Sequence, residues 1–227
     1  MPSIHSRATL DDGLAQMQRD LRMMASLVDV SIERSVGALA RLDHTLAEKV
    51  VAQDREINTL RFSIEDQAIH LIATQQPIAG DLRQVIATLL VVTELERIGD
   101  YSAGIAKIVL RHEEMPLLKP LVDIPRMAGV CREMLRASLD AFITRDATAA
   151  EVVAARDDEV DALYEQVYRE LLTFMLGDPR TIDRATWLLW VAHNLERIGD
   201  RVQNICERTV FEVTGVMREF TSPSTAT

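Results

Sequence analysis

The residues Leu95-Glu96-Arg97-Ile98-Gly99-Asp100 occur a second time as Leu195-Glu196-Arg197-Ile198-Gly199-Asp200, and this LERIGD motif decides the fold. A second repeated segment precedes each copy, since residues 43–60 are similar in sequence to residues 146–163. Two repeated segments in the same order indicate an internal duplication. The chain has 227 residues. We therefore expect two similar halves of roughly 100 residues each, and each half is large enough to bury a core.

The composition favours packed helices over sheets. Hydrophobic residues make up 48% of the chain and aromatic residues only 4%, so aliphatic side chains and alanine have to form the core. The formal net charge of -10 argues against a nucleic-acid binder, because phosphate contacts need a basic surface. Cys131 and Cys206 show no CxxC spacing, which favours reduced core thiols and a cytoplasmic setting.

The sequence predicts no membrane-spanning segment and no signal peptide. The apolar runs fall far short of the ~20 residues that a spanning helix needs, and the first residues show no secretory signal pattern. We therefore expect contact with a membrane only peripherally, through partners.

Apolar residues recur at three- and four-residue steps in both halves, which predicts long amphipathic helices. Pro77 and Pro179 interrupt this pattern, because proline removes a backbone donor and disfavours helical geometry in the residue before it. Thr45 and Thr148 each stand three residues before a glutamate, so we expect each to cap a helix. The expected helices span about residues 9–42, 45–75, 78–111, 125–144, 148–176 and 181–220.

The predicted fold is all-α, with two tandem antiparallel three-helix bundles that arise from the duplication. We place the first bundle at residues 1–115 and the second at residues 121–220, joined by a proline-containing linker. Residues 221–227 are expected to be a disordered tail.

Acidic residues are spaced so that they share helix faces. The glutamate and aspartate of each LERIGD motif are four residues apart, which puts both carboxylates on one face, one turn apart. Folding each helix pair back at its proline brings these residues level with a second polar pair on the preceding helix. The candidate metal ligands are therefore Asp54, Asn58, Glu96 and Asp100 in the first half, and Asp157, Asp161, Glu196 and Asp200 in the second half.

Two acidic pairs that face each other repel unless a cation lies between them. Because every donor is an oxygen, the sets suit hard cations such as magnesium, manganese, calcium or iron rather than a thiolate zinc site. The alternative is that Glu96 and Glu196 form ordinary surface ion pairs with arginines, including Arg97 and Arg197. Periodicity alone does not show that the pairs face each other, and the repetition favours the metal site.

The sequence contains none of several common catalytic motifs. It lacks a glycine-rich phosphate loop, a GxSxG motif and an HExxH motif. Its histidines never complete the Glu-x-x-His of a ferritin-like di-iron site. We therefore predict that the chain is not an enzyme. Gly99 and Gly199 stand inside helices at a cost of ~1 kcal/mol each relative to alanine, so we expect them to allow close packing or to leave room for the site.

The run from Gln75 to Arg83 (QQPIAGDLR), followed by the two LERIGD motifs, resembles the PhoU family of phosphate-uptake regulators over nearly the whole chain. The resemblance implies two three-helix bundles in pseudo-twofold relation, with multinuclear clusters of iron, zinc, nickel or similar metals on the same eight residues. Two positions depart from the family pattern. Asn58 replaces a carboxylate, so the first site is expected to bind metal more weakly, and Gly104 lacks the amide that Asn204 retains.

The resemblance also implies a role. PhoU-like proteins hold the phosphate-starvation response off and restrain high-affinity phosphate uptake. They act in the cytoplasm beside the ATPase subunit of the phosphate ABC transporter and a phosphate-sensing histidine kinase, often as homodimers. An acidic helical adaptor that works by contact is compatible with that role. Two other interpretations stay open, namely a metal-storage or metal-dependent hydrolytic helical bundle and a helical scaffold without a site.

Overall fold

The computed structural model describes residues 4–111 and 116–220, with side chains from residue 7 onward. This part of the chain is mainly helical. The first half contains α1 (Ile4–Arg41), α2 (His44–Gln75) and α3 (Ala79–Arg111). The second half contains α4 (Asp123–Thr144), α5 (Ala147–Ala154), α6 (Asp157–Gly177), the short 3-10 helix η1 (Pro179–Thr181) and α7 (Ile182–Thr214). None of these helices is both long enough and apolar enough to cross a bilayer.

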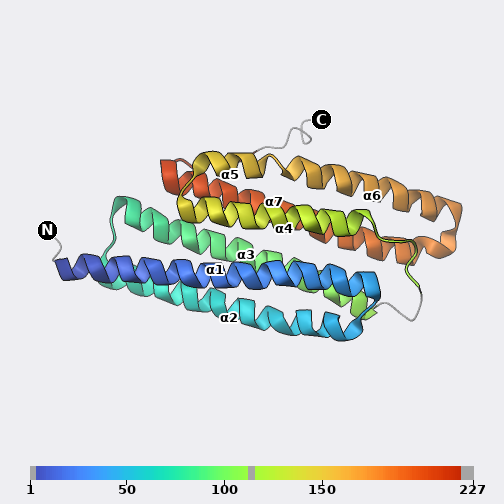
Figure 1. Cartoon of the computed structure of the whole chain (residues 1–227), viewed down its shortest axis with the longest axis horizontal. Helices are drawn as coiled ribbons and strands as arrows, with labels where there is room; N and C mark the ends of the chain where they lie inside the picture. The colour runs from blue at the N-terminus through green and yellow to red at the C-terminus, as the bar shows by residue number, and fades with distance from the viewer. Residues whose placement is uncertain (1–3, 112–115, 221–227) are drawn as a thin grey trace.

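The helices form two bundles that lie side by side. In the first, α1, α2 and α3 pack against one another, and in the second α4 and α7 pack against α5 and α6. Figure 1 shows both bundles aligned with the long axis of the molecule, with the α2–α3 turn and the α6–α7 turn at opposite ends. The prediction of two tandem helical bundles is confirmed. Residues 112–115 and the expected disordered tail at 221–227 lie outside the described residues.

One continuous apolar core joins the bundles, because α3 packs against α7 and α1 against α4. The LERIGD motifs contribute to it directly, since Leu95, Ile98, Leu195 and Ile198 are fully buried. The predicted core thiols are confirmed, because the two cysteines are free and buried.

Polar contacts also cross the boundary between the bundles. Asp29 of α1 accepts hydrogen bonds from Arg132 Nε at 2.9 Å and Arg136 Nη2 at 2.8 Å, both on α4. Burial opposes the charge of Asp29, but the two arginines outweigh it and lower the pKa of that carboxyl. Glu94 of α3 accepts from Arg201 and Asn204 of α7. Asn204 therefore contacts the other bundle through its amide nitrogen.

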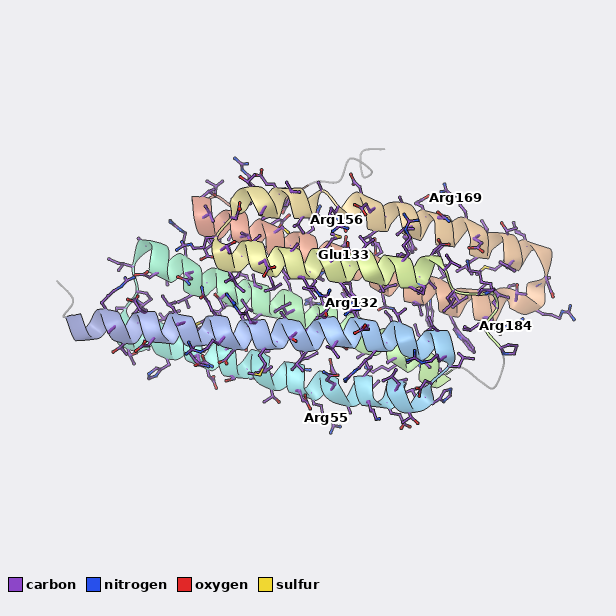
Figure 2. All side chains as sticks on the ribbon, in the orientation of Figure 1. Arg55, Arg132, Glu133, Arg156, Arg169 and Arg184 are labelled. Atoms are coloured by element: carbon purple, nitrogen blue, oxygen red, sulfur yellow. The ribbon has the colours of Figure 1, made fainter. Side chains whose placement is uncertain are left out.

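The expected helix over residues 148–176 is wrong, because the structure divides it. Backbone hydrogen bonds over three residues, from Arg156 to Val153 and from Glu159 to Arg156, tighten the chain between α5 and α6. The guanidinium of Arg156 lies beside Glu133 of α4 in Figure 2, with Nη2 2.9 Å from Oε2. No glycine or proline marks this step in the sequence. Its consequence is that Asp157 becomes the first residue of α6.

The expected last helix is also too long. It ends at Thr214 rather than near Phe220, because Gly215 follows with a φ of 75° and its N–H donates to the carbonyl of Phe211. Glycine reaches this left-handed conformation at no steric cost, so it is the natural helix terminator. The segment after it folds back, and the N–H of Phe220 donates to the buried Glu207.

The predicted threonine caps are wrong as well. The capping side chains are Asp43 before α2 and Asp146 before α5, each accepting a backbone N–H three residues later at 2.9 Å. Replacing Asp43 by alanine is expected to lower the free energy of unfolding by about 1 kcal/mol, because it leaves a helix N–H without its acceptor. Urea unfolding measures the loss. Thr45→Ala is the matched control, and an equal loss in that variant would contradict the assignment.

Candidate metal centre

In the first half, Asp54 of α2 faces the LERIGD motif of α3. α2 and α3 approach closely at the motif, since a Cβ added to Gly99 would lie 3.0 Å from Ile57 Cδ1 and 3.7 Å from Asp54 Oδ1. Burial and the nearby charge of Asp100 raise the pKa of Asp54, while Lys107 opposes the rise. The predicted level pairing therefore becomes real proximity in this bundle.

The second half brings its pairs together more tightly. A Cβ on Gly199 would lie 2.4 Å from Asp157 Oδ1, so only glycine leaves the Asp157 carboxylate its place. Asp161 interacts electrostatically with Asp200 and Glu196 across the two helices. The four predicted carboxylates of this half thus form one group, which we call the second acid cluster.

Mutual repulsion makes the second acid cluster unfavourable when every member is ionised. Burial is the largest influence on Asp157, followed by Asp161, Asp200 and Glu196, and together they raise its pKa to about 7. Burial first, and then the charge of Asp200, raise the pKa of Asp161 and of Glu196, while Arg197 and Arg201 oppose the rise at Glu196. Three acids in the first turn of α6, including Asp157, lie at the positive end of that helix dipole, which offsets only part of the repulsion.

Two carboxylate oxygens in this cluster are buried without a hydrogen bond. Asp157 is only 3% exposed, and its Oδ1 has no hydrogen-bond partner. Glu196 Oε2 is also buried without a hydrogen bond, although Arg197 Nε lies 3.4 Å and His193 Nδ1 3.6 Å from it. Buried acceptors of this kind are rare in folded proteins and call for a donor or a cation.

The first half pairs Glu96 with an internal cation, although its buried Asp54 Oδ1 also lacks a hydrogen bond. The guanidinium of Arg61 on α2 reaches across to α3 and donates from Nη1 to Glu96 Oε1 at 2.7 Å. Asn58 turns its amide nitrogen to Asp54, donating to the carbonyl at 3.0 Å and to Oδ2 at 3.3 Å. The residues Asp54, Asn58, Glu96 and Asp100 are near one another, but a built-in cation and an amide donor already serve two of them.

The alternative of ordinary arginine pairing holds in part. Glu96 pairs with Arg61, which the sequence comparison had not singled out, rather than with the exposed Arg97. In the second half Arg197 does pair with Glu196 as anticipated, with Nε 3.4 Å from Oε2, and its Nη1 also lies 3.0 Å from Asp200 Oδ2. The Arg197 side chain is 41% exposed and comes from the same helix as its partner, so it lies at the edge of the cluster toward solvent.

A cavity of about 430 Å³ opens beside the second acid cluster. Asp161, Glu196 and Tyr164 line it, together with Asp158 and Glu165. Of the second acid cluster, the cavity gives an ion and its water ligands a way to the carboxylates of Asp161 and Glu196.

The donor chemistry of the second acid cluster fits a hard cation, because its side chains offer only carboxylate oxygens and two of these lack a partner. Within residues 4–111 and 116–220, no three histidine, cysteine, aspartate or glutamate side chains already converge at ligand distance of one point. The carboxylates must therefore rotate to close around an ion. The first half fits less well, since Arg61 holds Glu96 and Asn58 donates to Asp54 Oδ2, although Asp54 Oδ1 lacks a partner there too.

Sequence reasoning missed Arg61 and Tyr164, which occupy equivalent positions in the two copies, seven residues after Asp54 and Asp157. An alignment of the two repeats could have identified this difference, because it pairs Arg61 with Tyr164 three residues after Asn58 and Asp161.

The two motif glycines should respond differently to substitution. Alanine gains ~1 kcal/mol of helix propensity at either position, but at Gly199 its methyl group displaces the Asp157 carboxylate, whereas at Gly99 it only presses on the end of Ile57. We expect Gly99→Ala to be the more stable variant by about 1 kcal/mol in metal-free urea unfolding. The opposite order would contradict the close approach at Gly199.

A family model described as the PhoU domain matches residues 21–109 and, a second time, residues 124–209. The chain belongs to the PhoU family. Each PhoU match falls within one bundle, so the family assignment and the duplication agree.

Relatives within the PhoU family are similar over almost their whole length. The phosphate-specific transport system accessory protein PhoU homolog of Caulobacter vibrioides is 42% identical over 212 residues, which cover 93% of this chain and 92% of that protein. The homolog of Clostridium acetobutylicum is 36% identical over 211 residues, covering 92% of this chain and 96% of that one.

Solved PhoU structures have the same fold. The crystal structure of PhoU from Pseudomonas aeruginosa superimposes with a TM-score of 0.86 at 34% identity, covering 91% of this chain and 99% of that chain. The phosphate transport system regulatory protein PhoU from Streptococcus pneumoniae gives a TM-score of 0.86 at 31% identity, covering 93% of this chain and all of that one.

Proposed function

We propose that this chain is an accessory protein of the phosphate-specific transport system that restrains high-affinity phosphate uptake and keeps the phosphate-starvation response off when phosphate is plentiful. The observation that carries the proposal is the PhoU match in both bundles together with 42% identity to an accessory protein of that system. The chain would act in the cytoplasm as an adaptor between the ATPase subunit of the transporter and a phosphate-sensing histidine kinase.

The physical character of the chain supports an adaptor. Its described part is helical, its net charge is -10, and its relatives are named as accessory or regulatory proteins rather than enzymes. Large helical faces suit contacts with other proteins. The proposed functional unit is a homodimer, as the family resemblance implies.

Metal binding forms the second part of the proposal. Asp157, Asp161, Glu196 and Asp200 would supply oxygen ligands to a hard cation such as manganese, magnesium or iron, as one ion or a multinuclear cluster. A bound cation would neutralise the repulsion among these carboxylates and hold α6 against α7. The supporting observations are the partnerless buried oxygens of Asp157 and Glu196 and the space left by Gly199.

A reporter for a phosphate-starvation promoter tests the regulatory role. The gene is deleted in its host, and cells are grown in ample phosphate with and without a wild-type copy. We expect the promoter to switch on in the deletion strain and to fall silent again on complementation. A promoter that stays off in the deletion strain would contradict the role as a negative regulator.

The metal part is tested separately by elemental analysis of protein purified without chelator. The combined variant Asp157→Asn/Glu196→Gln is expected to lose the metal found in the wild type. If the reporter responds but the wild type carries no metal and takes up none, the regulatory role stands and the metal proposal falls.

A further inference from the structure

The two copies of the duplication place different side chains at equivalent positions around their acids. Asp54 corresponds to Asp157, and the LERIGD acids correspond to each other. Four residues beyond Asp54, however, Asn58 stands where the second copy has Asp161, and seven residues beyond Asp54, Arg61 stands where it has Tyr164. The first copy therefore exchanges one carboxylate for an amide and gains one cation.

The cation of the first copy lies within the site. Arg61 spans from α2 to α3, with Nη1 2.7 Å from Glu96 Oε1 and Nε 2.8 Å from Glu65 Oε1. Its side chain is 28% exposed and that of Glu96 only 15%, so the pair is partly shielded from water. A guanidinium held between the helices supplies to Glu96 the positive charge that a metal ion would bring.

The second copy has no such bridge. Tyr164 lines the cavity beside Glu196 and carries no positive charge. The arginine that does reach this cluster, Arg197, approaches from the solvent side and leaves Asp157 Oδ1 and Glu196 Oε2 without a hydrogen bond. Asp54 Oδ1 in the first copy also lacks a hydrogen bond, so the copies differ at the motif glutamate: Glu96 has a guanidinium that crosses from the other helix, whereas Glu196 has Arg197 from its own helix.

We propose that this chain binds metal only in its second bundle, and that Arg61 replaces the metal ion in the first bundle as a permanent internal cation. The inference rests on the metal part of the proposed function and narrows it. It assigns the duplicated sites unequal roles: the second responds to the supply of cations, and the first remains locked whatever that supply is.

A reciprocal exchange between the copies tests the assignment with Mn²⁺ as the probe. Asn58→Asp/Arg61→Tyr gives the first copy the second pattern, and Asp161→Asn/Tyr164→Arg gives the second copy the first pattern. Asp54→Asn/Glu96→Gln and Asp157→Asn/Glu196→Gln serve as the matched acid variants. Each protein is stripped with EDTA, checked for helix content by circular dichroism, and titrated while free Mn²⁺ is counted by electron paramagnetic resonance.

We expect Asp54→Asn/Glu96→Gln to keep the Mn²⁺ capacity of the wild type, and Asp157→Asn/Glu196→Gln to lose it. Asp161→Asn/Tyr164→Arg should bind at least about tenfold more weakly. Asn58→Asp/Arg61→Tyr should bind about twice as much Mn²⁺ as the wild type, because its second cluster is unchanged. Without metal its melting temperature should fall, and Mn²⁺ should restore it, because removing Arg61 leaves the first acids uncompensated.

Equal losses of Mn²⁺ in the two acid variants would overturn the proposal while leaving the metal function intact. An unchanged capacity in a folded Asn58→Asp/Arg61→Tyr would also overturn it. A wild type that binds no Mn²⁺ would remove the metal function itself, and this inference with it. Should the exchange variant fail to fold, the two acid variants still decide between one site and two.

Discussion

Truncation of Ile198 to alanine is expected to lower the free energy of unfolding by about 2 to 5 kcal/mol, because it opens a cavity in a packed core. Ile198 is fully buried in α7 and belongs to the core that both bundles share. Ile98 is its counterpart in α3, equally buried, so Ile98→Ala should cost a similar amount. The measurement is urea unfolding monitored by circular dichroism, with the protein kept metal-free.

The control comes from the same motif. Arg97 is exposed on α3, so Arg97→Ala should change the free energy of unfolding by less than about 0.5 kcal/mol. Losses below about 1 kcal/mol in both isoleucine variants would contradict a core role for the motif. The LERIGD motif would then be maintained for its acids alone.

Glu212 gives the second large effect, which depends on pH. This glutamate of α7 is 1% exposed, and burial raises its pKa to about 7 although Arg145 lies 3.3 Å away and opposes the rise. Between about pH 4.5 and pH 7 the folded state therefore holds a proton that the unfolded state has released. The contribution of Glu212 to stability falls as pH rises through this window and is constant above it.

Glu212→Gln removes this titration. The free energy of unfolding of the variant minus that of the wild type should be about 1 to 3 kcal/mol larger at pH 8 than at pH 5. Urea unfolding of both proteins at the two pH values measures the difference, and groups common to both proteins cancel. Asp12→Asn, at an exposed site on α1, is the control and should show no such change. A gain from Glu212→Gln that is equal at pH 5 and pH 8 would contradict the buried titration.

Much of the architecture could be predicted because it rests on local pattern. The apolar steps of α1 and α3 and the break at Pro77 follow from helix periodicity and backbone chemistry, and the structure agrees with them. The step at Arg156 could not be predicted, since no glycine or proline marks it. The end of α7 had a local signal in Gly215 itself, but the apolar Val216 and Met217 that follow it obscured that signal.

The acids of the candidate site could be predicted from the sequence, but the side chains that contact them could not. Four-residue spacing identified the acids of both copies, because carboxylates one turn apart share a helix face. Spacing did not reveal that Arg61 crosses from α2 to Glu96, or that Asn58 turns its nitrogen toward Asp54. Those contacts depend on how far apart two helices lie and on how each side chain rotates.

The sequence by itself determined the duplication, the helical bundles, the family and the acids that gather at each LERIGD motif, since repetition and periodicity are properties of the chain order. Only the tertiary structure decided how these charges are arranged around the acids. It places Asp157 at the start of α6 with an oxygen lacking a partner, and it gives Glu96 a guanidinium. The physical reason is that burial and the distances between charges belong to packed helices and not to spacing along one chain.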